Sequence, residues 1–142
     1  MATYNKFNKF VEDIGNGVYN NSSHVFKVML TNTAPVATNS VKADLTEIAA
    51  GNGYTAGGNT ASVTSWSQTS GVAKLILADP ATWTASGGSI GPFRYVVLYD
   101  DTPTSPADPL IAWWDYGSSQ TLAAGETFTA DFDGTNGVYT FT

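Results

Sequence analysis

Residues 93 to 99 read FRYVVLY, and this stretch decides the fold class of the chain. Apart from Arg94, it holds only aromatic, β-branched and leucine residues, which are the types that favour a β-strand. The apolar run is nearly continuous rather than alternating, which is typical of a strand buried on both faces. We therefore expect residues 93 to 99 to form a central strand of a sheet.

Other stretches of the chain show the two-residue period of strands, and turn residues separate them. These stretches are residues 24–30, 61–69, 72–77, 81–85, 110–116, 126–132 and 138–142. Residues 41 to 49, VKADLTEIA, fit either a helical face or an extended segment, and we favour the extended form. Many short strands at regular spacing predict a mainly β protein, an antiparallel β-sandwich of jelly-roll or immunoglobulin-like type.

One helix is predicted at the N-terminus, over residues 3 to 16. Apolar residues recur there at spacings of three and four: Tyr4, Phe7, Phe10, Val11, Ile14 and Val18. Thr3 is a candidate N-cap, and Gly15 and Gly17 are stop signals. The aromatic face either packs on the chain's own sheet, which we favour, or docks on a neighbouring chain. We expect a single domain over residues 1–142, with the sandwich in residues 23–142.

The composition restricts the classes of partner. The net charge is −6, whereas a nucleic-acid binder needs positive charge to neutralise phosphates. Charged residues make up 13% of the chain and aromatic residues another 13%, a balance that favours contact with other proteins. Without cysteine there is no disulfide and no thiolate metal site. No stretch approaches the roughly 20 apolar residues of a membrane span, so we expect neither nucleic acid nor membrane as a partner.

Residues 49 to 60, AAGNGYTAGGNT, could be a phosphate-binding loop or a structural turn. A phosphate loop opens a helix, and in the P-loop a lysine follows the glycines. Here Gly57 and Gly58 are followed by a β-type run without lysine. We favour a tight connection whose glycines supply positive φ angles, with Tyr54 anchored at the sandwich edge.

The titratable residues give no firm catalytic or metal pattern. His24 is the single histidine; a Ser-His-Asp triad is formally open, but a surface or edge position is favoured. The carboxylates of Asp100, Asp101, Asp108 and Asp115 could be a glycosidase pair or bind calcium. Their Asp- and Pro-rich surroundings favour turns, with weak calcium binding left open. We predict no catalytic residue, no cofactor and no enzymatic activity.

Trp113 and Trp114 are adjacent in a predicted strand, so their indoles point to opposite faces. One of them is expected in the core and the other is a candidate for exposure, beside Tyr116. Exposed aromatic side chains of this kind form carbohydrate platforms or protein hot spots. The candidate interface residues are Tyr4, Phe7, Phe10, Ile14, Trp113, Trp114 and Tyr116.

Several motifs, spread over nearly the whole chain, resemble a family of small tailed-bacteriophage proteins. They are FRYVVLYD at residues 93–100, PLIAWWDYG at 109–117, LTNTAP at 30–35, GNGYTAGG at 51–58 and GVY at 137–139. The resemblance implies a virion structural protein, foremost a decoration (cement) protein that binds and stabilises the head shell. It implies the major capsid protein and copies of itself as partners, with a homotrimer as one option. It also implies synthesis in the bacterial cytoplasm and location on the head surface. The alternative is a tail or fibre module that binds a host glycan or receptor.

Overall fold

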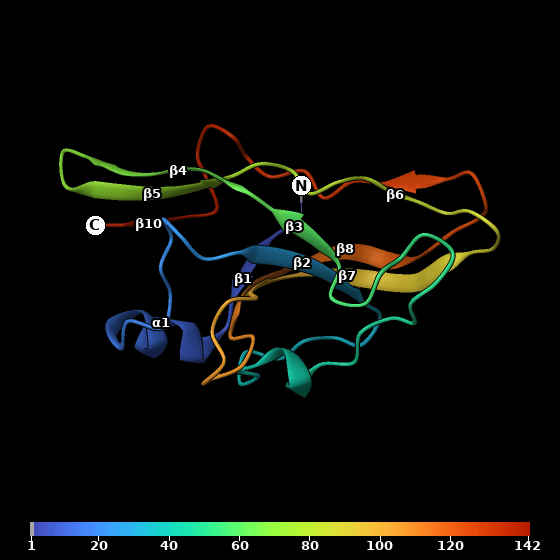
Figure 1. Ribbon diagram of the computed structural model, residues 1–142, viewed down its shortest axis with the longest axis horizontal. Coiled ribbons are helices and arrows are strands. Elements are labelled where there is room, and N and C mark those ends of the chain that lie inside the picture. The colour runs from blue at the N-terminus through green and yellow to red at the C-terminus, as the bar shows by residue number, and fades with distance from the viewer. Residues whose placement is uncertain (1) are drawn as a thin grey trace.

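A five-stranded antiparallel sheet forms the centre of the computed structural model, which describes residues 2–142 (Figure 1). Its strands, in spatial order, are β1 (Tyr4–Lys6), β8 (Leu110–Leu122), β7 (Ile90–Asp100), β2 (Phe26–Thr31) and β3 (Asn59–Ala61). The order places β7 in the middle of the sheet, with β8 on one side and β2 on the other. The central strand predicted from FRYVVLY is therefore confirmed, and it extends beyond that stretch at both ends.

Successive side chains of β7 enter two different hydrophobic clusters. Val96 and Leu98 belong to the larger cluster, and Val97 and Tyr99 belong to the smaller one. Alternate side chains of a strand enter separate clusters in this way when both faces of its sheet are covered. It explains why the sequence of β7 shows an apolar run with no polar face.

A second layer lies above the main sheet in Figure 1. It holds a three-stranded sheet, in the order β10 (Tyr139–Phe141), β5 (Val72–Leu77), β4 (Val63–Thr69), and the pair β6 (Trp83–Thr84) with β9 (Thr127–Phe128). Leu75, Leu77 and Trp83 of this layer pack in the larger cluster with Val28 and Leu98 of the main sheet. The chain is thus mainly β, with antiparallel sheets in a sandwich-like arrangement, as predicted.

The opposite face of the main sheet is covered by helical segments and loops, below the sheet in Figure 1. They include the helix α1 (Asn8–Gly15) and the 3-10 turn η1 (Lys42–Asp44). The smaller cluster lies on this side, with Phe7, Met29 and Leu110 fully or almost fully buried. Within residues 2–142, no helix combines the length and the apolarity that crossing a bilayer requires.

The predicted helix over residues 3 to 16 is wrong in its first turn. Residues Tyr4–Lys6 form β1, which pairs with β8 from Tyr4 opposite Trp114 to Lys6 opposite Ala112. The helix begins at Asn8, and its N-cap is Phe7 in an extended conformation rather than Thr3. The apolar spacing alone does not separate the strand from the helix that follows it. Residues 4 to 6 form a strand because pairing with the edge of β8 satisfies their backbone hydrogen-bonding groups.

Several predicted strands differ in extent from the structure; residues 81–85, for example, form only the two-residue strand β6. Residues 41 to 49 are extended only around η1, where isolated bridges join Val41 to Pro109 and Glu47 to Thr31. The predicted strand over residues 126–132 is reduced to the two residues of β9. Each segment pairs over only a few residues, β9 with β6 and residues 41–49 through the two isolated bridges.

Candidate functional site

A groove lined by aromatic side chains opens on the surface beside β8, with a volume of about 630 Å³. We call it the aromatic groove; its rings are Tyr4, Trp114, Tyr116, Phe128 and Phe132. Trp114 makes edge contacts with Tyr4 and Phe132, at ring-centroid distances of 5.7 and 5.5 Å. Tyr116 makes an edge contact with Phe128 at 6.0 Å. These contacts are the T-shaped arrangements that aromatic rings prefer, and they hold the walls of the groove in place.

Strand geometry brings these rings together. Trp114 and Tyr116 are two residues apart in β8 and so point to the same face of the sheet. Tyr4 is directly opposite Trp114 in β1. Phe128 and Phe132 come from the segment around β9, where each second side chain faces the sheet. Tyr116 remains 54% exposed, so the groove offers ring surface to a partner.

Acidic side chains stand at the edge of the aromatic groove. Asp131 and Asp133 are among its lining residues, and both are exposed. The backbone amide of Asn136 donates to the Asp133 carboxylate at 2.8 Å and holds the pKa of that carboxyl below its usual range. Burial raises the pKa of Tyr4 to about 12, so its phenol stays neutral even in alkaline solution that ionises an exposed tyrosine. The groove therefore combines neutral aromatic walls with a negative rim.

The other candidate interface residues lie elsewhere. Trp113 is on the opposite face of β8, where its ring packs on Phe7 at 4.5 Å. Phe7 is fully buried and Phe10 is 3% exposed, so both belong to the interior of the chain and offer little surface to a partner. The packing of this aromatic pair on the chain's own sheet, which we favoured, is confirmed. Ile14 lines a second, smaller pocket.

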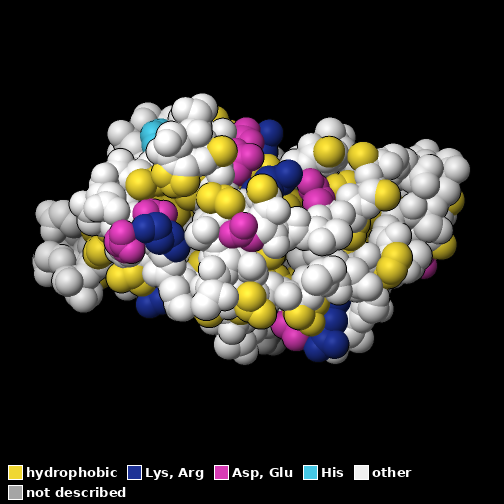
Figure 2. All heavy atoms as spheres, turned by 90° about the horizontal axis from the view of Figure 1, so that it is seen from below, with side chains coloured by type: hydrophobic (Ala, Val, Ile, Leu, Met, Phe, Trp, Pro, Cys, Tyr) yellow, Lys and Arg dark blue, Asp and Glu magenta, His cyan; other side chains and the backbone are white. Residues whose placement is uncertain are grey.

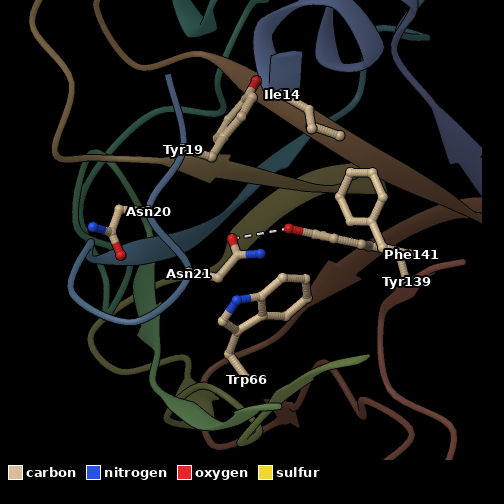
Figure 3. A pocket seen from close by; sticks show the side chains of 7 residues that line it. All are labelled: Ile14, Tyr19, Asn20, Asn21, Trp66, Tyr139 and Phe141. Atoms are coloured by element: carbon tan, nitrogen blue, oxygen red, sulfur yellow. Dashed lines mark hydrogen bonds between the residues drawn. The ribbon is translucent and has the colours of Figure 1, made fainter. Parts of the chain in front are cut away.

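This second pocket, which we call the Trp66 pocket, has a volume of about 220 Å³ (Figure 3). Three of its lining residues come from strands: Trp66 from β4, and Tyr139 and Phe141 from β10. The remaining lining residues are Ile14, Tyr19, Asn20 and Asn21. The Tyr139 hydroxyl donates to the Asn21 side-chain oxygen at 2.9 Å, across 118 positions of sequence. The bond joins the segment after α1 to the C-terminal strand.

The glycine-rich loop is a structural connection, as predicted. Gly51, Gly53, Gly57 and Gly58 all have positive φ. Tyr54 is 2% exposed, and its hydroxyl donates to Glu47 at 2.7 Å while the amide of Leu30 donates to it at 3.0 Å. The Glu47 carboxylate also accepts the amide of Gly57. Tyr54 thus fastens the loop to β2, and the amide of Gly57 fastens it to Glu47.

The acidic residues of the predicted turns do not converge on a cation. Asp101 pairs with Lys27 at 3.0 Å, and Asp115 pairs with Arg94 at 2.7 Å. Within residues 2–142, no three acidic, histidine or cysteine side chains are grouped so that they could hold a metal ion. The four aspartates are instead used one by one, in ion pairs and turns.

His24 has a partner that sequence reasoning missed. Its Nδ1 lies 2.6 Å from Oδ2 of Asp100, whose side chain is completely buried at the end of β7. Burial raises the pKa of the Asp100 carboxyl, and the hydrogen bond from His24 opposes that rise. His24 itself is partly exposed, in keeping with the edge position that was predicted for it.

Sequence reasoning also missed Phe128 and Phe132 in the aromatic groove and Trp66 in the smaller pocket. The alternation of TFTADF at residues 127–132 could have identified Phe128 and Phe132, because it places both phenylalanines on one face of a strand. No sequence pattern around Trp66 indicates a pocket, because the other residues that line it come from both ends of the chain. Figure 2 shows the face of the molecule that lies below in Figure 1, where acidic and basic side chains are scattered among hydrophobic and uncharged polar groups.

Comparisons of the chain with protein-family models, with curated proteins and with solved structures find no match.

Proposed function

We propose that the chain is a structural protein of a tailed-bacteriophage particle, a decoration protein that binds the head shell and stabilises it. The aromatic groove carries this proposal, because partly exposed aromatic rings on a weakly charged surface are the usual centre of a protein interface. The motifs that resemble small phage virion proteins support the same class. The protein would be made in the host cytoplasm and would end on the outer surface of the head.

The groove indicates the chemistry of its partner segment. Its walls are aromatic, and its rim holds Asp131 and Asp133. The whole chain carries a net charge of −6. An apolar segment of the major capsid protein flanked by lysine or arginine would complement both features. Copies of the protein around a local symmetry axis, including a trimer, could present several grooves to the shell at once.

Shells assembled without this protein provide the test. We expect the purified protein to bind them and to raise their resistance to heat. Tyr116→Ala and Trp114→Ala should each weaken binding roughly 30-fold, because the truncation of a central aromatic anchor costs about 2 kcal/mol or more. Phe141→Ala is the matched control, since it removes a ring that is 40% exposed and lies outside the aromatic groove.

Mass spectrometry and immunolabelling of purified virions decide the location. Absence of the protein from the particle contradicts the proposal altogether. Labelling of the tail instead of the head favours the second candidate function, a tail or fibre module that binds a host glycan or receptor.

The exposed ring of Tyr116 beside Trp114 is the observation that favours this second candidate. A glycan array separates the two functions, with Trp113→Ala as an internal control because Trp113 lies on the opposite face of β8. A specific hit that is lost in Trp114→Ala but kept in Trp113→Ala favours adhesion. Arrays without a hit favour the decoration protein.

A further inference from the structure

We propose that the Trp66 pocket binds a single sugar ring, such as the terminal residue of a glycan. The pocket shares none of its residues with the aromatic groove. The proposal therefore does not rest on the proposed function, and it would hold for a head protein as well as for a tail protein.

The first argument is a buried amide with a free donor. Asn21 is 8% exposed, and its side-chain oxygen accepts the hydroxyl of Tyr139, which fixes the orientation of the amide. Its nitrogen then points into the space between Trp66 and Tyr139 (Figure 3). No acceptor within residues 2–142 is hydrogen-bonded to that nitrogen. Among the described residues, Trp83 holds the one fully buried side-chain nitrogen or oxygen that lacks a partner, so the Asn21 nitrogen is open to solvent. An oxygen of a bound ligand would replace water as its acceptor there.

The second argument is the arrangement of the rings. Trp66 lies 6.2 Å from Tyr139 and 6.3 Å from Phe141 between ring centroids, and none of these pairs is stacked face to face. In Figure 3, the rings of Trp66, Tyr139 and Phe141 border one space and lie at an angle to one another rather than stacked. The C–H face of a sugar ring packs on such surfaces, while its hydroxyls meet the polar tips of Trp66, Tyr139 and Asn21.

Charge and size define the class of ligand. None of the seven residues that line the pocket is charged, which favours a neutral ligand over a phosphate or a carboxylate. The volume of about 220 Å³ is below the range of roughly 300 to 1,000 Å³ of pockets for drug-sized molecules. A single ring suits this space, whereas a proline-rich peptide, the other ligand that aromatic grooves take, needs an elongated groove.

A titration followed by ¹H–¹⁵N NMR tests the proposal on the full chain. The probes are D-glucose, D-galactose and N-acetyl-D-glucosamine, each added alone, and a proline-rich decapeptide. We expect at least one sugar to shift the side-chain signals of Asn21 and Trp66 in a saturable way. The dissociation constant should be about 1 mM, because so small a ligand makes few contacts.

Three variants assign the binding to the pocket. Asn21→Asp keeps an oxygen for the Tyr139 hydroxyl but removes the free donor, and Trp66→Phe keeps an aromatic ring but removes the indole N–H. Each should weaken sugar binding about fivefold or more, which corresponds to the loss of one hydrogen bond. Trp114→Phe makes the same chemical change in the aromatic groove and should leave sugar binding unchanged.

The outcomes against the proposal are distinct. If no sugar shifts the Asn21 or Trp66 signals of the unmodified protein, the proposal is wrong, whatever the variants do. If the decapeptide shifts them and the sugars do not, the pocket is a peptide site. If Trp114→Phe weakens sugar binding as much as Trp66→Phe does, the sugar lies in the aromatic groove. Shell binding by the same variants reports on the proposed function separately.

Discussion

At the scale of single residues, the glycines with positive φ are not equivalent. A side chain on Gly58 would overlap the carbonyl oxygen of Val28, and the residue has a φ of +74°. Gly71, in the turn between β4 and β5, has a φ of +82° but no atom within 4 Å of the position of a Cβ. The glycine-rich stretch could be identified as a turn from sequence, but the contact that makes Gly58 irreplaceable is set by a strand about thirty residues earlier.

The pair of glycines separates backbone strain from steric overlap. Gly71→Ala should lower the free energy of unfolding by about 1 kcal/mol, since alanine is strained at positive φ. Gly58→Ala should lower it by more than about 2 kcal/mol, because β2 or the loop must also move. Urea denaturation of both variants measures the difference. Equal losses would mean that the loop relaxes away from β2 without cost.

Two aspartates of the main sheet should respond to pH in opposite ways. The pKa of Asp100 is raised by burial, and the pKa of Asp115 is lowered, chiefly by its hydrogen bonds with Arg94. The unfolded chain releases the Asp100 proton at a lower pH than the folded chain does, so Asp100 reduces stability as pH rises from 3.8, its ordinary pKa, through the raised pKa. The ionised Asp115 carboxylate stabilises the fold at pH values above 3.8, its ordinary pKa. This stabilisation is lost as pH falls through the lowered pKa.

We therefore expect Asp100→Asn to melt at a higher temperature than the unmodified protein at neutral pH. The difference should vanish as pH falls below 3.8, the ordinary pKa of this carboxyl. Asp115→Asn should lose melting temperature at neutral pH and approach the unmodified protein in acid. Thermal unfolding between pH 3 and pH 7 measures both differences. A loss at neutral pH in Asp100→Asn would show that the hydrogen bond with His24 outweighs the burial of the carboxylate.

At the scale of elements, the N-terminal segment is a strand joined directly to a helix. Phe7 stands at the junction, is fully buried, and packs with Trp113, Met29 and Val97. Phe10, three residues later, contacts the rings of Tyr19 and Tyr139 at 5.1 and 5.2 Å in the larger cluster. The two phenylalanines thus belong to different clusters: Phe7 packs on residues of the main sheet, and Phe10 packs on Tyr19 and on Tyr139 of β10 in the second layer.

Removal of these rings should destabilise the protein itself. Phe7→Ala and Phe10→Ala should each lower the free energy of unfolding by roughly 3 to 5 kcal/mol, which is the cost of truncating a buried phenylalanine. Val11→Ala, at a helix position that is 53% exposed, should change it by less than about 0.5 kcal/mol. Urea denaturation of the isolated protein is the measurement. Unchanged stability in the Phe7 and Phe10 variants would mean that the segment does not pack on the sheet in solution.

At the scale of the whole molecule, the layers differ in how well they are covered. The main sheet is covered on both faces, and β2, β7 and β8 hold most of the fully buried residues. The three-stranded sheet packs on the main sheet with one face, and its strands β4 and β10 carry many exposed or half-exposed residues. Backbone hydrogen bonds in a layer with one open face are more accessible to local opening.

Amide hydrogen exchange should therefore be slowest in β2, β7 and β8 and faster in β4 and β10. Proteolytic fragments analysed by mass spectrometry resolve the two groups of strands. Equal protection in all of these strands would show that the two layers open together, as a single cooperative unit.

The sequence by itself determined the mainly β class, the central place of β7 and the turn role of the glycine loop. These features are encoded locally, in the period of apolar residues and in the residues that tolerate positive φ. It also determined that Trp113 and Trp114 face opposite sides of a strand, because adjacent strand residues always do.

The tertiary structure alone decided which strands pair and what each face meets. Residues 4 to 6 have helical apolar spacing but form a strand, because the edge of β8 offers hydrogen-bond partners from more than a hundred residues away. The aromatic groove joins Tyr4 to Phe132, and the Trp66 pocket joins Asn21 to Tyr139. No local pattern contains these contacts, because the free energy that selects them comes from burial between segments that are distant in sequence.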